Sequence, residues 1–343
     1  MFRSLIVPLD GSALAERALP YGIRLAQSGK GKLILMRAVL APAPRTLDGA
    51  GMERDQAEAI AEAEQYLADM AESISGQVAE VQTVAPYGRA AAKILETASH
   101  LQADAIVMAT HGRTGLSHLL YGSVTEAVLA ESALPVCVVY ARPGEAPAPP
   151  FSPYSARVLI PQDFSGYDAP AVHAALEIVG TRGELVLMTA VTPPDRVAYD
   201  EMGHVLAYLD QQEEADKLQA RDYLETIAAA LRERAEPIQV KIDVRVGDPA
   251  TGISMAALDE GADLIVMATH GRTGLRRAVL GSVAGKVLRS ATTPVMLVHP
   301  HPVPTAPTTP DHEGQFGRRS RVTSFLGQSD EERAARSSGA LHR

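Results

Sequence analysis

The sequence has no tryptophan, a single cysteine and few aromatic residues, which make up 4% of its 343 residues. The lone Cys137 excludes an intrachain disulfide. The chain also lacks an excess of positive charge, because 32 lysines and arginines stand against 41 acidic residues and the formal net charge is −9. Proteins that bind nucleic acid usually present a basic surface with aromatic stacking residues, so we expect no nucleic-acid partner.

Long apolar runs are missing as well. A membrane-spanning helix needs about 18 or more consecutive apolar residues, and a secretory signal carries a shorter apolar core near the N-terminus. The first residues instead enter a short apolar run of the kind that forms a strand. We therefore expect a cytoplasmic protein without a membrane partner.

A long segment of the chain occurs twice. The sequence that begins at Ala103 returns almost unchanged from Ala262, and equivalent residues such as Gly112 and Gly271 lie 159 positions apart. The chain is therefore a tandem duplication, and each half carries the same candidate functional residues.

Each half alternates short apolar runs with helix-patterned segments, which is typical of βα units on a parallel sheet. In the first half the expected strands are residues 5–9, 33–38, 78–84, 105–109 and 135–139. The expected helices of the two halves are residues 54–74, 90–101 and 124–132, and 211–231, 249–258 and 283–290. A further helix follows the first strand, and Pro20 inside it is expected to kink it. The sequence thus predicts an α/β fold of two tandem, doubly wound domains, each with a five-stranded parallel sheet in a flavodoxin- or Rossmann-like layered arrangement.

Composition divides the chain into four parts. With 46% apolar residues, it has enough apolar material for two cores of roughly 140 residues each. We expect a first domain at residues 1–142, a Pro-rich linker at 143–155 and a second domain at 156–300. Residues 301–343 have no periodicity and are expected to form a disordered tail.

Polar residues follow the first strand of each half. Asp10 is followed at two residues by Ser12, and Asp163 in the same way by Ser165. In a doubly wound sheet, ligands bind outside the carboxyl ends of the strands where the strand order reverses, and these residues are expected there. Two interpretations remain open. The pair caps the following helix with a serine and an acidic charge, or it contacts a ligand.

A glycine-containing loop follows the fourth strand. Gly112 and Arg113 open it, and Gly122 and Ser123 stand where the next helix begins. Glycines allow backbone N–H groups to approach a phosphate, and a helix N-terminus turns its free donors toward the same place. A plain turn before a capped helix is the alternative, but the combined spacing favours a cradle for an anion or phosphate. Neither a Walker loop nor a Rossmann fingerprint is present.

These residues resemble the motifs of the universal stress protein family, over about residues 2–139 and 157–298. Members that bind ATP carry Gly-x2-Gly-x9-Gly-Ser/Thr, and the spacing from Gly112 to Gly122 and from Gly271 to Gly281 fits this pattern. The first glycine is replaced by Ala109 in one half and by Ala268 in the other. A methyl group there is expected to weaken ATP binding without abolishing it.

The resemblance implies a non-catalytic stress-response or signalling protein in which ATP, with or without Mg²⁺, is a regulatory ligand. It places the ribose at Asp10 and Asp163, between walls formed by Met108, Ala109, Met267 and Ala268. It places adenine at the backbone near Ala38 and Ala190. The phosphates would be held by Gly112, Arg113, Gly122, Ser123 and Val124, and by Gly271, Arg272, Gly281, Ser282 and Val283.

In similar proteins the fifth strands pair across a dimer. Residues 136–139 and 295–298 would then join the two sheets within one chain as an internal pseudo-dimer, while a homodimer of whole chains stays open. His111 and His270 have no partnered nucleophile and are interpreted as loop hydrogen-bonding residues; no catalytic or metal site is predicted.

Two other functions compete with this interpretation. An interaction or sensor module that has lost its nucleotide is one. A slow ATP hydrolase is the other, and it is disfavoured because no Ser-Gly-Gly-type loop follows the first strand.

Overall fold

The computed structural model describes residues 2–40, 49–111, 122–141, 155–165, 168–180, 182–193, 198–199, 205–207, 209–233, 238–269 and 280–299. The expected linker lies outside these ranges except for its last residue, and the expected tail lies outside them entirely. The linker and the disordered tail therefore stay predictions.

The elements of the two halves follow the expected order, with bounds that differ by a few residues from the sequence prediction. The first half contains β1 (Ser4–Pro8), the 3₁₀ helix η1 (Ala15–Ala18), α1 (Leu19–Gly29), β2 (Lys32–Met36), α2 (Gly49–Ser73), β3 (Glu80–Val84), α3 (Ala90–His100), β4 (Ala105–His111), α4 (Ser123–Glu131) and β5 (Val136–Ala141). The second half contains β6 (Arg157–Pro161), α5 (Ala169–Val179), β7 (Glu184–Val191), β8 (Ala198–Tyr199), β9 (Val205–Ala207), α6 (Leu209–Arg232), β10 (Gln239–Val246), α7 (Pro249–Asp259), β11 (Leu264–Ala268), α8 (Ser282–Ser290) and β12 (Val295–Val298).

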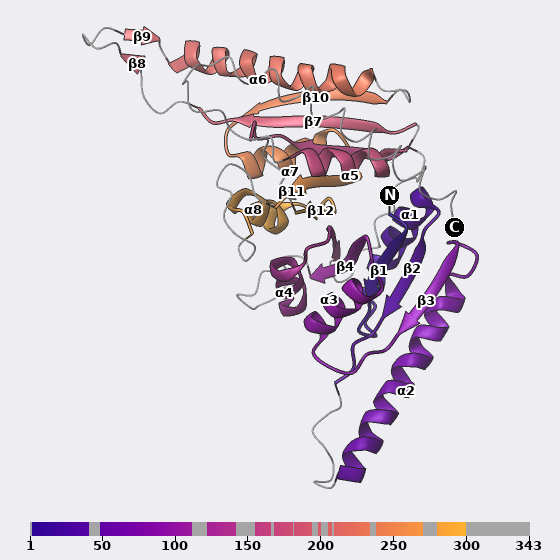
Figure 1. The fold of residues 1–343 in the computed structure, drawn as a ribbon. Coiled ribbons are helices and arrows are strands. Elements are labelled where there is room, and N and C mark those ends of the chain that lie inside the picture. The colour runs from indigo at the N-terminus through magenta and orange to yellow at the C-terminus, as the bar shows by residue number, and fades with distance from the viewer. Residues whose placement is uncertain are drawn as a thin grey trace, which may run out of the picture.

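Ten strands form one continuous sheet in the order β10-β7-β6-β11-β12-β5-β4-β1-β2-β3. In this sheet all neighbouring strands of the same half are parallel, and only β12 and β5 are antiparallel. This pair joins the halves, so the predicted pairing of the fifth strands is confirmed. Figure 1 shows the indigo-to-magenta half and the pink-to-yellow half at opposite ends of the sheet.

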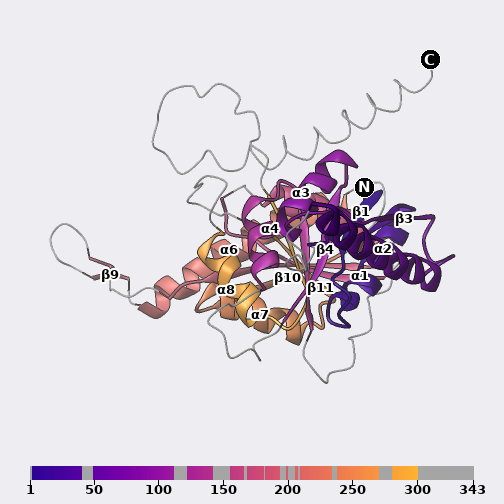
Figure 2. The same cartoon turned by 90° about the horizontal axis from the view of Figure 1, so that it is seen from below.

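Helices cover both faces of the sheet. One core lies under α1, α2, α5 and α6, and the other lies under α3, α4, α7 and α8. Neighbouring residues of β2 alternate between the two cores, with Leu33 and Leu35 in the first and Ile34 and Met36 in the second. The strands read as continuous apolar runs because both faces are buried. In Figure 2 the helices surround the strands labelled β4, β10 and β11.

The expected kink at Pro20 was wrong. Pro20 is the second residue of α1, in the first helical turn, where the missing N–H has no intrahelical partner to lose. The residues before it form the separate 3₁₀ helix η1. Pro170 has the same place in α5 of the second half. The proline therefore begins the helix and does not bend it.

The second half is longer between its second strand and the following helix, because β7 ends at Val191 and α6 begins at Leu209, whereas β2 ends at Met36 and α2 begins at Gly49. The short antiparallel strands β8 and β9 lie there. No helix in the described parts of the chain is long and apolar enough to cross a membrane.

Candidate functional site

The sheet order places the predicted site residues at one edge. In the first half β1 lies between β2 and β4, so the strand order reverses at β1. Asp10 follows β1, Ala38 follows β2, and Thr110 lies near the end of β4. Because parallel strands end at the same edge, these residues meet at the carboxyl ends of neighbouring strands. The second half repeats this arrangement around β6, β7 and β11.

The turn after β1 is fixed by hydrogen bonds of its own side chains. The Oδ1 atom of Asp10 accepts from the Ser12 amide at 2.9 Å and from the Ser12 hydroxyl at 2.5 Å. The Ser12 Oγ in turn accepts from the Ala15 amide at 3.2 Å, where η1 begins. Ser12 thus holds the turn before η1, but it is not a helix N-cap residue, since Leu14 precedes η1 and Ala18 precedes α1, each without a side-chain cap hydrogen bond. Asp10 is exposed, and within the described residues its Oδ2 atom accepts no hydrogen bond, so one carboxylate oxygen is available to a ligand.

The second half forms the same turn with a different environment. The Oδ1 atom of Asp163 accepts from the Ser165 amide at 2.9 Å. The Asp163 amide donates to Oδ2 of Asp168 at 3.3 Å, and Asp168 is buried. Asp163 itself is half-buried, so it is less accessible than Asp10.

Gly122 stands directly before α4 with φ −57° and ψ 141°, a backbone conformation open to any residue. A Cβ built at this position has no described atom within 4 Å. Neither backbone strain nor packing against the described residues therefore requires a glycine here. Because Gly122 has no side chain, there is space at the N-terminus of α4, where the first backbone N–H groups have no intrahelical partner.

Hydrogen bonds from the amides of Gly122 and its counterpart Gly281 connect the starts of α4 and α8 to the fourth strand of each half. The Gly122 amide donates to Oγ1 of the buried Thr110 at 3.5 Å, and the Gly281 amide donates to the Thr269 carbonyl oxygen at 2.9 Å. Gly281 has nearly the same backbone angles as Gly122, φ −55° and ψ 148°. The two halves thus present the same helix start at the carboxyl edge.

The remaining predicted residues divide into two groups. Ser123 and Ser282 are exposed, Val124 and Val283 are half-buried, Met108 and Met267 are buried, and Ala38, Ala109, Ala190 and Ala268 are half-buried. Four loop residues lie outside the described residues, so their proposed roles stay predictions: Gly112, Arg113, Gly271 and Arg272. The side chain of His111 and the whole of His270 also lie outside the described part of the chain, and their interpretation stays a prediction.

Sequence reasoning missed a polar cluster at the carboxyl ends of β1 and β2. The Tyr66 hydroxyl on α2 donates to Oε1 of Glu16 at 2.8 Å, and the Arg37 guanidinium lies 5.0 Å from the centroid of the Tyr66 ring. Burial and the hydrogen bond to Glu16 raise the pKa of Tyr66 above its ordinary value, Arg37 opposes this shift, and the charge on Asp10 adds to it. The sequence contained one signal for this cluster, which was the positively charged Arg37 directly after an apolar strand.

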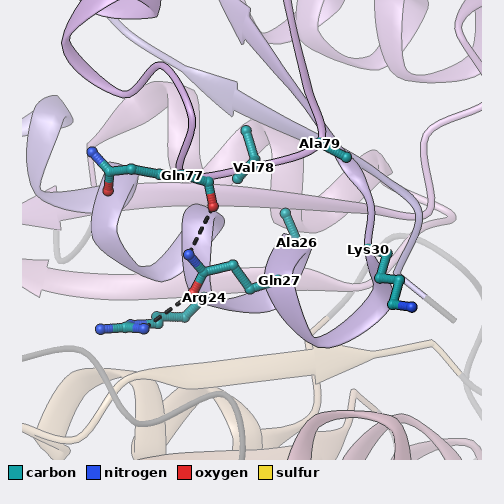
Figure 3. A pocket seen from close by; sticks show the side chains of 7 residues that line it. All are labelled: Arg24, Ala26, Gln27, Lys30, Gln77, Val78 and Ala79. Atoms are coloured by element: carbon teal, nitrogen blue, oxygen red, sulfur yellow. Dashed lines mark hydrogen bonds between the residues drawn. The ribbon is translucent and has the colours of Figure 1, made fainter.

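A cavity of about 490 Å³ lies at the opposite edge of the sheet, where the segments that lead into β2 and β3 meet. The Gln27 side chain bridges it by donating to the Gln77 carbonyl oxygen at 2.7 Å and accepting from Arg24 at 3.0 Å. Figure 3 shows Arg24 and Lys30 on opposite sides of Gln27, pointing away from each other. Their charges do not converge on one point, so this cavity is not the candidate site.

Two further features limit the chemistry of the described residues. No group of three or more His, Cys, Asp or Glu side chains among them is placed to hold a metal ion. Cys137 is fully buried in β5, and burial raises the pKa of its thiol to about 12.

Comparison with known proteins gives a consistent family. The universal stress protein family model matches residues 1–140 and 155–299. A universal stress protein of Mycolicibacterium smegmatis is 26% identical over 303 residues, which cover 86% of this chain and 97% of the relative. One of Mycobacterium bovis is 25% identical over 323 residues, which cover 89% and 97%. The crystal structure of a universal stress protein from Archaeoglobus fulgidus has a TM-score of 0.62 at 20% identity, covers 88% of this chain and 100% of its own, and agrees in fold.

Proposed function

Since the chain belongs to the universal stress protein family, we propose that it binds ATP, with or without Mg²⁺, at the carboxyl edge of each half. In this proposal the nucleotide is a regulatory ligand of a stress-response or signalling protein. The phosphates lie at the N-termini of α4 and α8, and the ribose lies beside Asp10 and Asp163.

The observation that carries the proposal is the space in front of α4. Gly122 has a backbone that any residue adopts and no described atom within 4 Å of a Cβ. A glycine that neither its backbone nor packing against the described residues requires is explained by a group that occupies the space from outside. A phosphate suits this place because the free N–H groups and the positive end of the helix dipole both favour an anion.

The proposal also assigns the protein no turnover chemistry beyond a slow hydrolysis of ATP. The carboxylates at the first-half edge already have structural partners, since Asp10 holds Ser12 and Glu16 accepts from Tyr66. Phosphoryl transfer usually relies on metal-bound carboxylates and a positioned nucleophile. A module that binds no nucleotide is the alternative, and the methyl groups of Ala109 and Ala268 at the edge are the feature that favours it.

Mass spectrometry of small molecules released from the purified protein by denaturation, together with calorimetry, tests the proposal. We expect adenine nucleotide in the extract of the denatured protein, or ATP binding at two sites per chain after its removal. The Gly122→Val and Gly281→Val double variant should bind none, because a branched side chain fills the space of the phosphates in both halves. The Gly122→Ala variant is the graded control, and it should fold and lose less affinity. Equal ATP binding by the parent and the double valine variant would overturn the proposal.

A further inference from the structure

The turns after β1 and β6 share a backbone and differ in their side chains. In both, a serine amide donates to an aspartate Oδ1 at 2.9 Å. In both, the residue between them has a positive φ, 86° at Gly11 and 64° at Phe164. Glycine adopts this conformation readily, whereas a bulky residue there is an outlier. The second half thus places a large side chain where the first half has none.

In the first half a guanidinium occupies the space beside the glycine. A Cβ built at Gly11 would lie 3.4 Å from Cζ of Arg37, and the same Cζ lies 5.0 Å from the centroid of the Tyr66 ring. Arg37 therefore lies between the Gly11 backbone and the Tyr66 ring. A guanidinium has five N–H donors, yet within the described residues no acceptor bonds to the Arg37 guanidinium and no carboxylate forms an ion pair with it.

In the second half an aromatic ring takes this space. The Phe164 ring lies 4.5 Å from the ring of Tyr223, the counterpart of Tyr66, at an interplanar angle of 76°. Thr189 stands in place of Arg37, and its hydroxyl donates to the Gln162 carbonyl oxygen at 2.8 Å. Among the described residues, the second half therefore has no cation at the position equivalent to Arg37, and the hydroxyl that stands there is already bonded to the protein.

The position of Arg37 along the edge indicates what it binds. The Gly122 amide is bonded to Thr110 near the end of β4, Asp10 follows β1 and Arg37 follows β2, so the three positions lie in the order of the strands. With phosphates at Gly122 and a ribose at Asp10, Arg37 lies on the far side of the ribose from the phosphate chain. In dinucleotide-binding folds a carboxylate near the ribose binds its free 2′-hydroxyl, whereas an arginine near the ribose accommodates a phosphate at that position. Its planar donors fit such a group in two parallel hydrogen bonds.

We propose that the first half selects adenine nucleotides that carry a second phosphate on the ribose, with Arg37 as the residue that binds it, and that the second half does not. This inference rests on the proposed nucleotide function. Gly11 has no side chain to cover the Arg37 guanidinium. In the second half, Phe164 fills the equivalent space and Thr189 replaces the charged residue. The Asp10 carboxylate opposes a nearby phosphate, so the selectivity depends on the Arg37 charge and disappears without it.

Single-site proteins test this directly. Gly281→Val leaves only the first-half site, and Gly122→Val leaves only the second. AMP, adenosine 2′,5′-bisphosphate and adenosine 3′,5′-bisphosphate are titrated into each by calorimetry, so that the two ribose positions are distinguished. In the Gly281→Val protein we expect one bisphosphate to bind roughly 10- to 100-fold tighter than AMP, the range of a charge-assisted hydrogen bond. In the Gly122→Val protein we expect no such preference.

Variants of the cation assign the effect to one residue. Arg37→Gln in the Gly281→Val protein should abolish the preference and leave AMP binding in place, whereas Arg37→Lys should retain part of it as a point charge. Arg24→Gln removes one positive charge at the opposite edge and should change nothing. If AMP binds but the bisphosphates bind no tighter, or if the preference survives Arg37→Gln, the inference is wrong and the nucleotide function stands. If neither single-site protein binds any of the nucleotides, including ATP, both are wrong.

Discussion

Val138 of β5 lies directly opposite Val295 of β12, and both side chains are completely buried. Cys137 and Met296 form the next pair, and Val136 faces Leu297. This antiparallel ladder is the only place in the described sheet where a strand of one half bonds to a strand of the other. The ladder therefore turns two duplicated sheets into one, and it buries an edge that each half alone would expose.

A charge in this ladder should separate the halves. Val138→Asp and Leu297→Asp each bury a carboxylate without a partner, which costs several kcal/mol. We expect a larger radius of gyration by small-angle scattering, with the circular dichroism of folded α/β domains retained. An exposed control, Leu258→Asp on α7, should scatter as the parent does. Variants that remain as compact as the parent would contradict the role of the ladder.

Cys137 reports on the same ladder. Because burial raises the pKa of its thiol to about 12, the thiol stays protonated in the folded protein at pH 8 and is shielded from reagents. We expect slow labelling by a thiol reagent in the native parent and rapid labelling in denaturant. Val138→Asp should accelerate the native reaction, since it opens the strand pair that covers Cys137. Rapid labelling of the native parent would show that the ladder opens readily without any substitution.

The fold was largely predictable because duplication and burial leave clear signals. Strands buried on both faces appear as continuous apolar runs, and β2 and β4 were located within two residues of their bounds. The start of the edge strand β3 was placed two residues early, since its exposed residues at Glu80 and Thr83 break the apolar pattern. The 3₁₀ helix before Pro20 was missed because its four residues have the composition of an ordinary helix.

The candidate site was less predictable than the fold. The glycine at position 122 was visible in the sequence, but its ordinary backbone angles and the space beside it were not. The contact of Arg37 with Tyr66 joins β2 to α2 and depends on how that helix packs against the sheet. The spacing of residues in the sequence does not predict such a contact. The sequence shows that Phe164 replaces Gly11, but only the structure shows that the Phe164 ring packs against the ring of Tyr223.

ATP should stabilise the folded chain, because the space before α4 exists only in the native state. At one hundred times its dissociation constant, a ligand at one site adds about 2.7 kcal/mol to the free energy of unfolding. For a protein of this size that corresponds to a rise in Tm of roughly 5 °C. Thermal melts with ATP, ADP, AMP and tripolyphosphate measure it. The Gly122→Val and Gly281→Val double variant should show no shift, and an unchanged Tm of the parent with every nucleotide at millimolar concentration argues against binding.

Asp10 combines a structural and a proposed binding role, and two substitutions separate them. Asp10→Asn keeps an oxygen that accepts from the Ser12 amide, so the turn and the Tm should stay close to those of the parent. Asp10→Ala removes that acceptor and should cost about 1 kcal/mol of stability, as the loss of one hydrogen bond does. In the Gly281→Val background both should weaken ATP binding, by roughly 1–3 kcal/mol, if the carboxylate binds the ribose. Should only the alanine variant bind more weakly, Asp10 acts on the site through its turn, and the ribose is held by other residues.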